Sequence, residues 1–90
     1  MQGESVMERE FLLQTIKDSI VEIFPTLSAT EITEIDSLKN LGANSIDRAE
    51  IIILTLNRLK LKVPLVQFAS AKNIGGLIDI FHNASLQPVN

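Results

Sequence analysis

The sequence of 90 residues has no cysteine, tryptophan or tyrosine, and it has one histidine. The lack of cysteine excludes disulfides and thiolate metal sites, and one histidine is too few for an imidazole metal cluster. A net charge of −3 argues against nucleic acid as a partner, because phosphate binding needs clustered Lys and Arg. No apolar run approaches the length of a bilayer span, and residues 1–10 are too polar for a signal peptide. We therefore expect a soluble, cytoplasmic protein that binds neither nucleic acid nor a membrane.

The residues that are present predict an all-α protein with an aliphatic core. Hydrophobic types make up 46% of the chain, yet its four aromatic residues are all phenylalanine. Apolar side chains recur with helical spacing in residues 8–24, and Pro25 ends that helix. Further helices are expected at about 45–59, 64–69 and 74–84, and no segment alternates with period two for long enough to indicate a strand.

These helices predict one domain over residues 1–90, a monomer whose folded part covers about 8–84. The first two helices are joined by a long loop, residues 25–44, and loops of that length in a small domain tend to be functional or disordered. Apolar side chains spaced like anchors to the core favour an ordered loop: Ile32, Ile35, Leu38 and Leu41. Pro64 suits the first position of the brief third helix, and Asn73 suits the N-cap of the fourth.

The segment 41–47, Leu-Gly-Ala-Asn-Ser-Ile-Asp, lies where the long loop meets the second helix. We expect the hydroxyl of Ser45 to be exposed there, beside backbone N–H groups that have no partner within the helix. A phosphodiester on that hydroxyl would be an anion at a helix N-terminus, which is electrostatically favourable. Local sequence alone favours a plain helix cap, because Asn and Ser are common N-cap residues. Both interpretations stay open on local grounds.

The order of elements and the residues around Ser45 resemble the acyl carrier protein family over residues 8–84. The family motif is Gly-any-Asp-Ser-Leu, and Gly42, Ser45 and Ile46 match it, with Ile in place of Leu. Asn44 departs from the motif, because it replaces the Asp before the serine. The resemblance implies that Ser45 receives 4′-phosphopantetheine from coenzyme A through a phosphopantetheinyl transferase.

Three further matches at family spacing support the resemblance. Asp47 and Glu50 match the acidic positions that follow the serine, Val63-Pro64 resembles the apolar-Pro step before the third helix, and Asn73-Ile74-Gly75 resembles the start of the fourth. The resemblance implies a carrier and not an enzyme. Its arm ends in a thiol that holds an acyl group as a thioester, and partner enzymes do the chemistry while the tether raises the local concentration of their substrate.

The second helix has more apolar side chains than one buried face can use. A helical wheel gives one broad apolar arc, which would be buried and would leave Ile51 and Leu54 exposed. That arc is made of Ile46, Ala49, Ile52, Ile53, Leu56 and Leu59. The family resemblance implies instead that Ile51, Ile52 and Leu59 are buried. It assigns a partner-binding face to Asn44, Ile46, Asp47, Ala49, Glu50 and Ile53. We adopt this second assignment, because Ser45 must share a face with the docking residues, and exposed apolar strips mark binding surfaces.

The segment 41–48 also resembles free-standing donor carriers of polyketide β-branching cassettes. Such donors deliver an acetyl-like unit to an enzyme similar to hydroxymethylglutaryl synthase, and an acyltransferase or a decarboxylating ketosynthase acts on them. Acceptor carriers of these systems typically bear a Trp in the second helix, which is absent here. Arg48 and Arg58 are expected to make the partner face less acidic than in carriers of fatty-acid synthesis. The resemblance implies an acetyl or malonyl cargo. The alternatives are a general fatty-acid or peptidyl carrier and, in another class, a helical adaptor without a prosthetic group.

Overall fold

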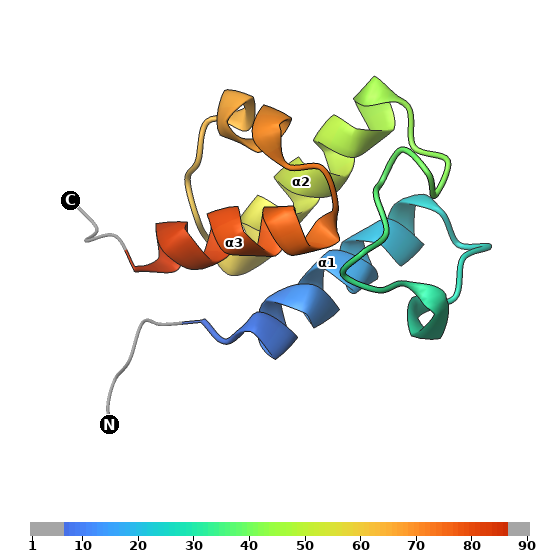
Figure 1. Ribbon diagram of the computed structural model, residues 1–90, viewed down its shortest axis with the longest axis horizontal. Coiled ribbons are helices and arrows are strands. Elements are labelled where there is room, and N and C mark those ends of the chain that lie inside the picture. The colour runs from blue at the N-terminus through green and yellow to red at the C-terminus, as the bar shows by residue number, and fades with distance from the viewer. Residues whose placement is uncertain (1–6, 87–90) are drawn as a thin grey trace.

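The computed structural model describes residues 7–86 and is all-α within them, so the predicted four-helix architecture is confirmed (Figure 1). The third of the four predicted helices is a 3-10 helix, η2, and a further 3-10 turn, η1, lies in the long loop. The elements in chain order are α1 Arg9–Ile23, η1 Ala29–Glu31, α2 Ser45–Leu59, η2 Leu65–Ser70 and α3 Ile74–Ser85. No helix among the described residues is both long and apolar enough to cross a bilayer.

One predicted boundary is corrected. The third helix begins at Leu65, and Pro64 is its N-cap, because the Pro64 carbonyl accepts the first i+3 hydrogen bond while its ψ of 137° is still extended. Residues next to the expected folded part, about 8–84, also make contacts with it. Ser85 is buried as the last residue of α3, and the Met7 carbonyl lies 2.9 Å from Nδ1 of His82. The rest of the expected tails lies outside the described residues.

The core lies where α1 packs against both α2 and α3, and it is aliphatic, as predicted (Figure 1). Each α-helix supplies a buried stripe, such as Leu12, Ile16 and Ile20 of α1. Phe68 of η2 and Phe81 of α3 add an aromatic pair, with ring centroids 5.0 Å apart. These contacts hold η2 on the side of the molecule where α2 begins.

The long loop is ordered along its described length and is bonded to the start of α3. The N–H of Ile74 donates to the carbonyl of Asp36 at 2.8 Å, and the N–H of Gly75 donates to that of Glu34 at 2.9 Å. A Cβ at Gly75 would lie 3.3 Å from the Glu34 carboxylate, a tight contact, so the close approach of the loop favours glycine there. The loop therefore has a fixed position beside α3, and from there the chain continues into α2.

Three of the four expected loop anchors contact the core, and one does not. Ile32 and Leu38 are buried, and Leu41 is half-buried against the core. Ile35 is 84% exposed, so its prediction as an anchor is wrong. The cause is a tight turn, in which the Asp36 N–H donates to the Thr33 carbonyl and the Asp36 carboxylate accepts from the Thr33 N–H at 2.7 Å. Ile35 lies in this turn and points away from the core.

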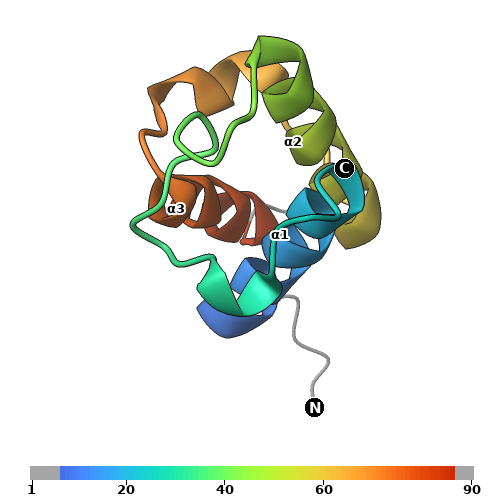
Figure 2. The same cartoon turned by 90° about the vertical axis from the view of Figure 1, so that its right-hand side faces the viewer.

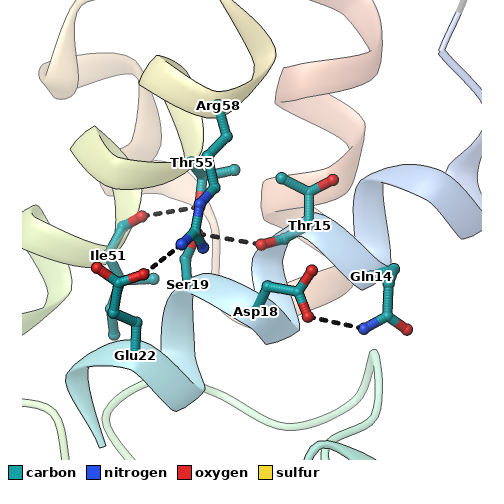
Figure 3. Close-up of polar contacts among 8 residues, drawn as sticks. All are labelled: Gln14, Thr15, Asp18, Ser19, Glu22, Ile51, Thr55 and Arg58. Atoms are coloured by element: carbon teal, nitrogen blue, oxygen red, sulfur yellow. Dashed lines mark hydrogen bonds and ion pairs between the residues drawn. The ribbon is translucent and has the colours of Figure 1, made fainter.

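A buried polar contact joins α1 to α2 (Figure 3). The hydroxyl oxygens of Ser19 and Thr55 lie 2.9 Å apart, and both side chains are fully buried. The Arg58 guanidinium donates to the Ser19 hydroxyl at 3.2 Å and forms an ion pair with Glu22. Arg58 is therefore directed at α1 and not at the predicted partner face, which corrects the expectation that it reduces the acidity of that face. We call Ser19, Glu22, Thr55 and Arg58 the polar seam.

The polar seam lies on the face of α2 that is turned toward α1. Each hydroxyl also bonds to a carbonyl of its own helix, Ser19 to that of Thr15 at 3.0 Å and Thr55 to that of Ile51 at 2.8 Å, so their mutual contact adds about 0.5–1.5 kcal/mol, the net value of one hydrogen bond. With Thr55 facing Ser19, Ile51 and Ile52, one helical turn earlier, are buried with it. Periodicity alone predicted that Ile51 would be exposed, and that prediction is wrong. The assignment from the family resemblance, with Ile51, Ile52 and Leu59 inside, is confirmed.

Candidate functional site

Ser45 is the first residue of α2, and its side chain is exposed. The helix start is fixed by a capping box, in which the Asn44 side chain accepts from the Asp47 N–H at 2.8 Å and the Asp47 carboxylate accepts from the Asn44 N–H at 3.3 Å. Asn44 is thus the N-cap, as its residue type predicted. The cap leaves the hydroxyl of Ser45 accessible at the positive end of the helix dipole.

The chain reaches this helix start through a tight turn at the end of the long loop. Gly42 has a φ of 108°, in the left-handed region that disfavours residues with a Cβ, and its N–H donates to the Lys39 carbonyl at 3.0 Å. The next residue, Ala43, is buried, and its N–H donates to the Leu38 carbonyl. The Gly of the motif is therefore required by the turn, and the buried Ala43 anchors the chain just before Ser45.

A groove of about 600 Å³ opens beside Ser45. Figure 2 views the end of the molecule where the long loop, the start of α2 and η2 gather around the start of α3. The groove has apolar walls that include Ile52, Phe68 and Leu77, and Ser45 itself lines it. Its volume lies in the range of about 300–1,000 Å³ that small-molecule sites occupy. A group attached to the Ser45 hydroxyl would therefore begin at the edge of a groove that can accept it.

The predicted partner face is exposed at most of its positions. Ile46 is 71% exposed and Ile53 43%, the side chains of Asn44 and Glu50 are exposed, and those of Asp47 and Ala49 are half-buried. All six lie on α2 or at its N-cap, so they share an element with Ser45. Ile46 and Ile53 lie two helical turns apart on one face of α2, and apolar side chains grouped on one face mark a binding surface, whereas single scattered ones do not.

The short η2 adds two residues to this surface that the sequence analysis did not single out. Leu65 and Val66 are exposed, and Leu65 lines the same groove as Ser45. Two large apolar residues directly after Pro64, in a helix too short to bury both, were the signal that could have identified them. The exposed apolar surface near Ser45 thus spans both α2 and η2.

The other polar groups of interest lie away from Ser45. Arg9 of α1 pairs with Glu34 at 2.7 Å and also with Asp79, and these carboxylates, Glu34 foremost, raise the pKa of the guanidinium. His82 is occupied by the contact with the Met7 carbonyl. Within residues 7–86, no three metal-ligating side chains come together. The polar groups near Ser45 are thus the backbone and side chains at the start of α2 and the residues that line the groove.

The comparisons with known proteins identify the family. The family model described as the phosphopantetheine attachment site matches residues 14–81, from α1 to α3. The chain belongs to this family and is a non-catalytic carrier of phosphopantetheine, as the motif around Ser45 predicted.

Two similar proteins show which carriers within the family this chain resembles. The chain is 35% identical over 77 residues to the polyketide biosynthesis acyl-carrier-protein AcpK of Bacillus subtilis (strain 168). The aligned region covers 86% of this chain and 94% of that protein. A chain in the crystal structure of the curacin biosynthetic pathway HMG synthase in complex with acetyl donor-ACP matches with a TM-score of 0.79 and 43% identity, over 86% of this chain and 99% of that chain. The predicted resemblance to acyl carrier proteins, and to donor carriers among them, is confirmed.

Proposed function

We propose that this protein is a donor acyl carrier protein of polyketide biosynthesis, with its arm on Ser45. It carries an acetyl or malonyl group as a thioester and delivers it to an enzyme of the HMG synthase type. One observation carries the proposal: Ser45 presents an exposed hydroxyl at the start of α2. The chain that presents it is 43% identical to a chain in the complex of an HMG synthase with its acetyl donor-ACP. A cytoplasmic location and a monomeric state are part of the same proposal.

The residues around Ser45 fit a phosphopantetheine group. The arm supplies a thiol that holds the acyl group, and everything else is done by side chains and backbone of the protein. The start of α2 offers backbone N–H groups and the helix dipole to the phosphodiester. Arg48, one turn further along, is half-buried, and it donates to the Ala43 carbonyl at 3.4 Å. No Asp or Glu lines the groove beside Ser45, and the carboxylate of the nearby Asp47 accepts from the Asn44 N–H in the capping box.

Partner docking is assigned to the face around Ser45. Ile46 and Ile53 supply apolar contacts, Glu50 supplies charge, and Leu65 and Val66 of η2 extend the same surface. Successive partners would share this face: a phosphopantetheinyl transferase, an acyltransferase or decarboxylating ketosynthase, and the HMG-synthase-like enzyme. Asn44 removes one acidic contact of the family pattern, so we expect the transferase to depend more on the apolar residues.

Attachment is tested by intact-mass measurement after incubation with coenzyme A and a broad-specificity phosphopantetheinyl transferase. The protein is expected to gain the mass of one arm, and Ser45→Ala is expected to abolish the gain. Ser70→Ala is a matched control, because Ser70 is also exposed at a helix end but lacks the motif. No gain of mass in the unchanged protein would favour the alternative function, a helical adaptor that binds a partner through the exposed apolar side chains of α2 and has no prosthetic group.

The donor role is tested by acetyl transfer. The protein is loaded with an acetyl-pantetheine arm and mixed with an HMG-synthase-like enzyme, and acetylation of that enzyme is followed by mass. We expect transfer, and we expect Ile53→Glu to reduce it without preventing the loading. Normal loading with no transfer would leave a general fatty-acid or peptidyl carrier.

A further inference from the structure

The side chains that line the groove beside Ser45 have an unusual charge balance. The chain has 11 acidic and 8 basic residues, yet the lining includes Lys39, Arg48 and Lys72 and no acidic residue. The three cations come from different segments, the long loop, α2 and the connection before α3, so the folded chain brings them together. A groove with this balance on an otherwise acidic protein favours an anionic occupant.

These three cations have no carboxylate partner within the described part of the chain. The ion pairs in residues 7–86 use Arg9 and Arg58, both away from the groove. The side chains of Lys39 and Lys72 are exposed, and that of Arg48 is half-buried. A carboxylate that enters the groove would therefore find donors that are not already committed to an ion pair, and charge-assisted hydrogen bonds are about twice as strong as neutral ones.

Most of the remaining lining of the groove is apolar, and its uncharged polar residues are Ser37, Ser45 and Asn73. Leu38, Ile52, Phe68 and Leu77 line it and belong to the buried core. A charge placed among such side chains is costly unless it is paired, and the basic residues supply that pairing. Apolar walls and basic residues together match a short acyl chain that ends in a carboxylate.

We propose that this groove holds the acyl end of the arm on Ser45 when the acyl group ends in a carboxylate, as a malonyl group does, and releases neutral acyl groups. The inference rests on the proposed function, because it needs an arm on Ser45. A neutral acetyl group gains nothing from Lys39, Arg48 and Lys72, so it stays available to partners. The groove thereby distinguishes two loading states of the same carrier.

The test compares two isosteric acyl groups on the apo protein. A phosphopantetheinyl transferase loads it from malonyl-coenzyme A or from acetoacetyl-coenzyme A, in which a methyl group replaces the charged oxygen. In backbone amide NMR spectra, the malonyl form is expected to shift the signals of the groove residues relative to the form with a free thiol, and the acetoacetyl form is not. A carbon-13 label on the malonyl carboxylate then reports its pKa. The nearby cations are expected to lower this pKa by about one unit, the low end of the effect of an adjacent opposite charge.

Variants identify the groups responsible. Lys39→Gln/Lys72→Gln and Arg48→Gln are each expected to raise the carboxylate pKa toward its ordinary value and to reduce the malonyl-specific shifts. Lys62→Gln removes an exposed lysine outside this groove and is expected to change neither. All three variants change side chains that are exposed or half-buried, and a dispersed amide spectrum verifies that each is folded.

Two results would overturn the inference while leaving the carrier function intact. Groove shifts that are equal in all three arm states, measured relative to the apo protein, would mean that the phosphodiester, and not the carboxylate, occupies the basic residues. A groove in the malonyl form that is unshifted relative to the apo protein would mean that the acyl group stays outside. Failure of the proposed function itself is separately visible, because the protein would then gain no mass in the loading reaction.

Discussion

The orientation of α2 can be tested by making one substitution at two positions of the same helix. Ile51→Ala removes a side chain that is 1% exposed, and Ile53→Ala removes one that is 43% exposed. The chemical change is identical, and helix propensity changes equally at both sites. Any difference in the free energy of unfolding therefore reports burial.

The structure gives the expected magnitudes. Truncating a fully buried Ile to Ala costs about 2–5 kcal/mol, because the lost contacts leave a cavity. Ile53 keeps much of its surface in water and leaves no enclosed cavity, so its truncation is expected to cost about 1 kcal/mol or less. In a domain of this size each kcal/mol lowers the melting temperature by about 4–8 °C. Ile51→Ala should thus lower it by at least about 8 °C.

Urea unfolding followed by circular dichroism measures both variants, and partner docking is measured for each with the loaded protein. We expect Ile51→Ala to be destabilised but to bind its partner normally where it is folded. We expect Ile53→Ala to be nearly as stable as the parent and to bind more weakly. Equal destabilisation by the two substitutions would refute the reasoning, because it would mean that Ile53 belongs to the core and that the partner face is misassigned.

Three further predictions concern the helix start and the polar seam. Gly42→Ala should destabilise the fold by about 1–2 kcal/mol, measured by urea unfolding, since its φ of 108° disfavours a Cβ. Asn44→Ala should cost about 0.5–2 kcal/mol through loss of the cap, whereas Asn44→Asp should keep the stability and speed arm loading in a transferase assay, because it restores the acidic residue of the family motif. Thr55→Val, an isosteric change, should cost about 0.5–1.5 kcal/mol in thermal unfolding, because it removes the hydrogen bond to Ser19 while the Ser19 hydroxyl keeps its bond to the Thr15 carbonyl.

Most of the architecture follows from local signals in the sequence. The helical spacing of apolar residues, Pro25, and the caps Asn44 and Asn73 predict the three α-helices to within two residues at each end. Local signals do not decide the direction in which Ile35 points, because a side-chain hydrogen bond of Asp36 closes a turn there. They also leave out η1, a single turn with no buried residue.

The face that α2 turns to the core includes a long-range contact that periodicity does not contain. The apolar arc of α2 is wide enough to allow several rotations of the helix, and the observed rotation is the one that brings Thr55 to Ser19 and buries Ile51. Two ordinary polar residues, 36 positions apart, give no signal in a single sequence. The resemblance to known carriers predicted the correct face, because the buried and exposed positions of α2 in those carriers already reflect how that helix packs.

The same contact connects the stability of the protein to its function. By turning Thr55 and Ile51 toward α1, it leaves Ile46 and Ile53 exposed and Ile52 at the wall of the groove. Docking face and groove are therefore two consequences of one helix rotation, and Ser45 lies at their shared edge. A substitution that weakens the seam should then affect partner docking and the malonyl-specific shifts together, even though it contacts neither. Thr55→Val tests this coupling: loss of one property with full retention of the other would show that the face and the groove are positioned independently.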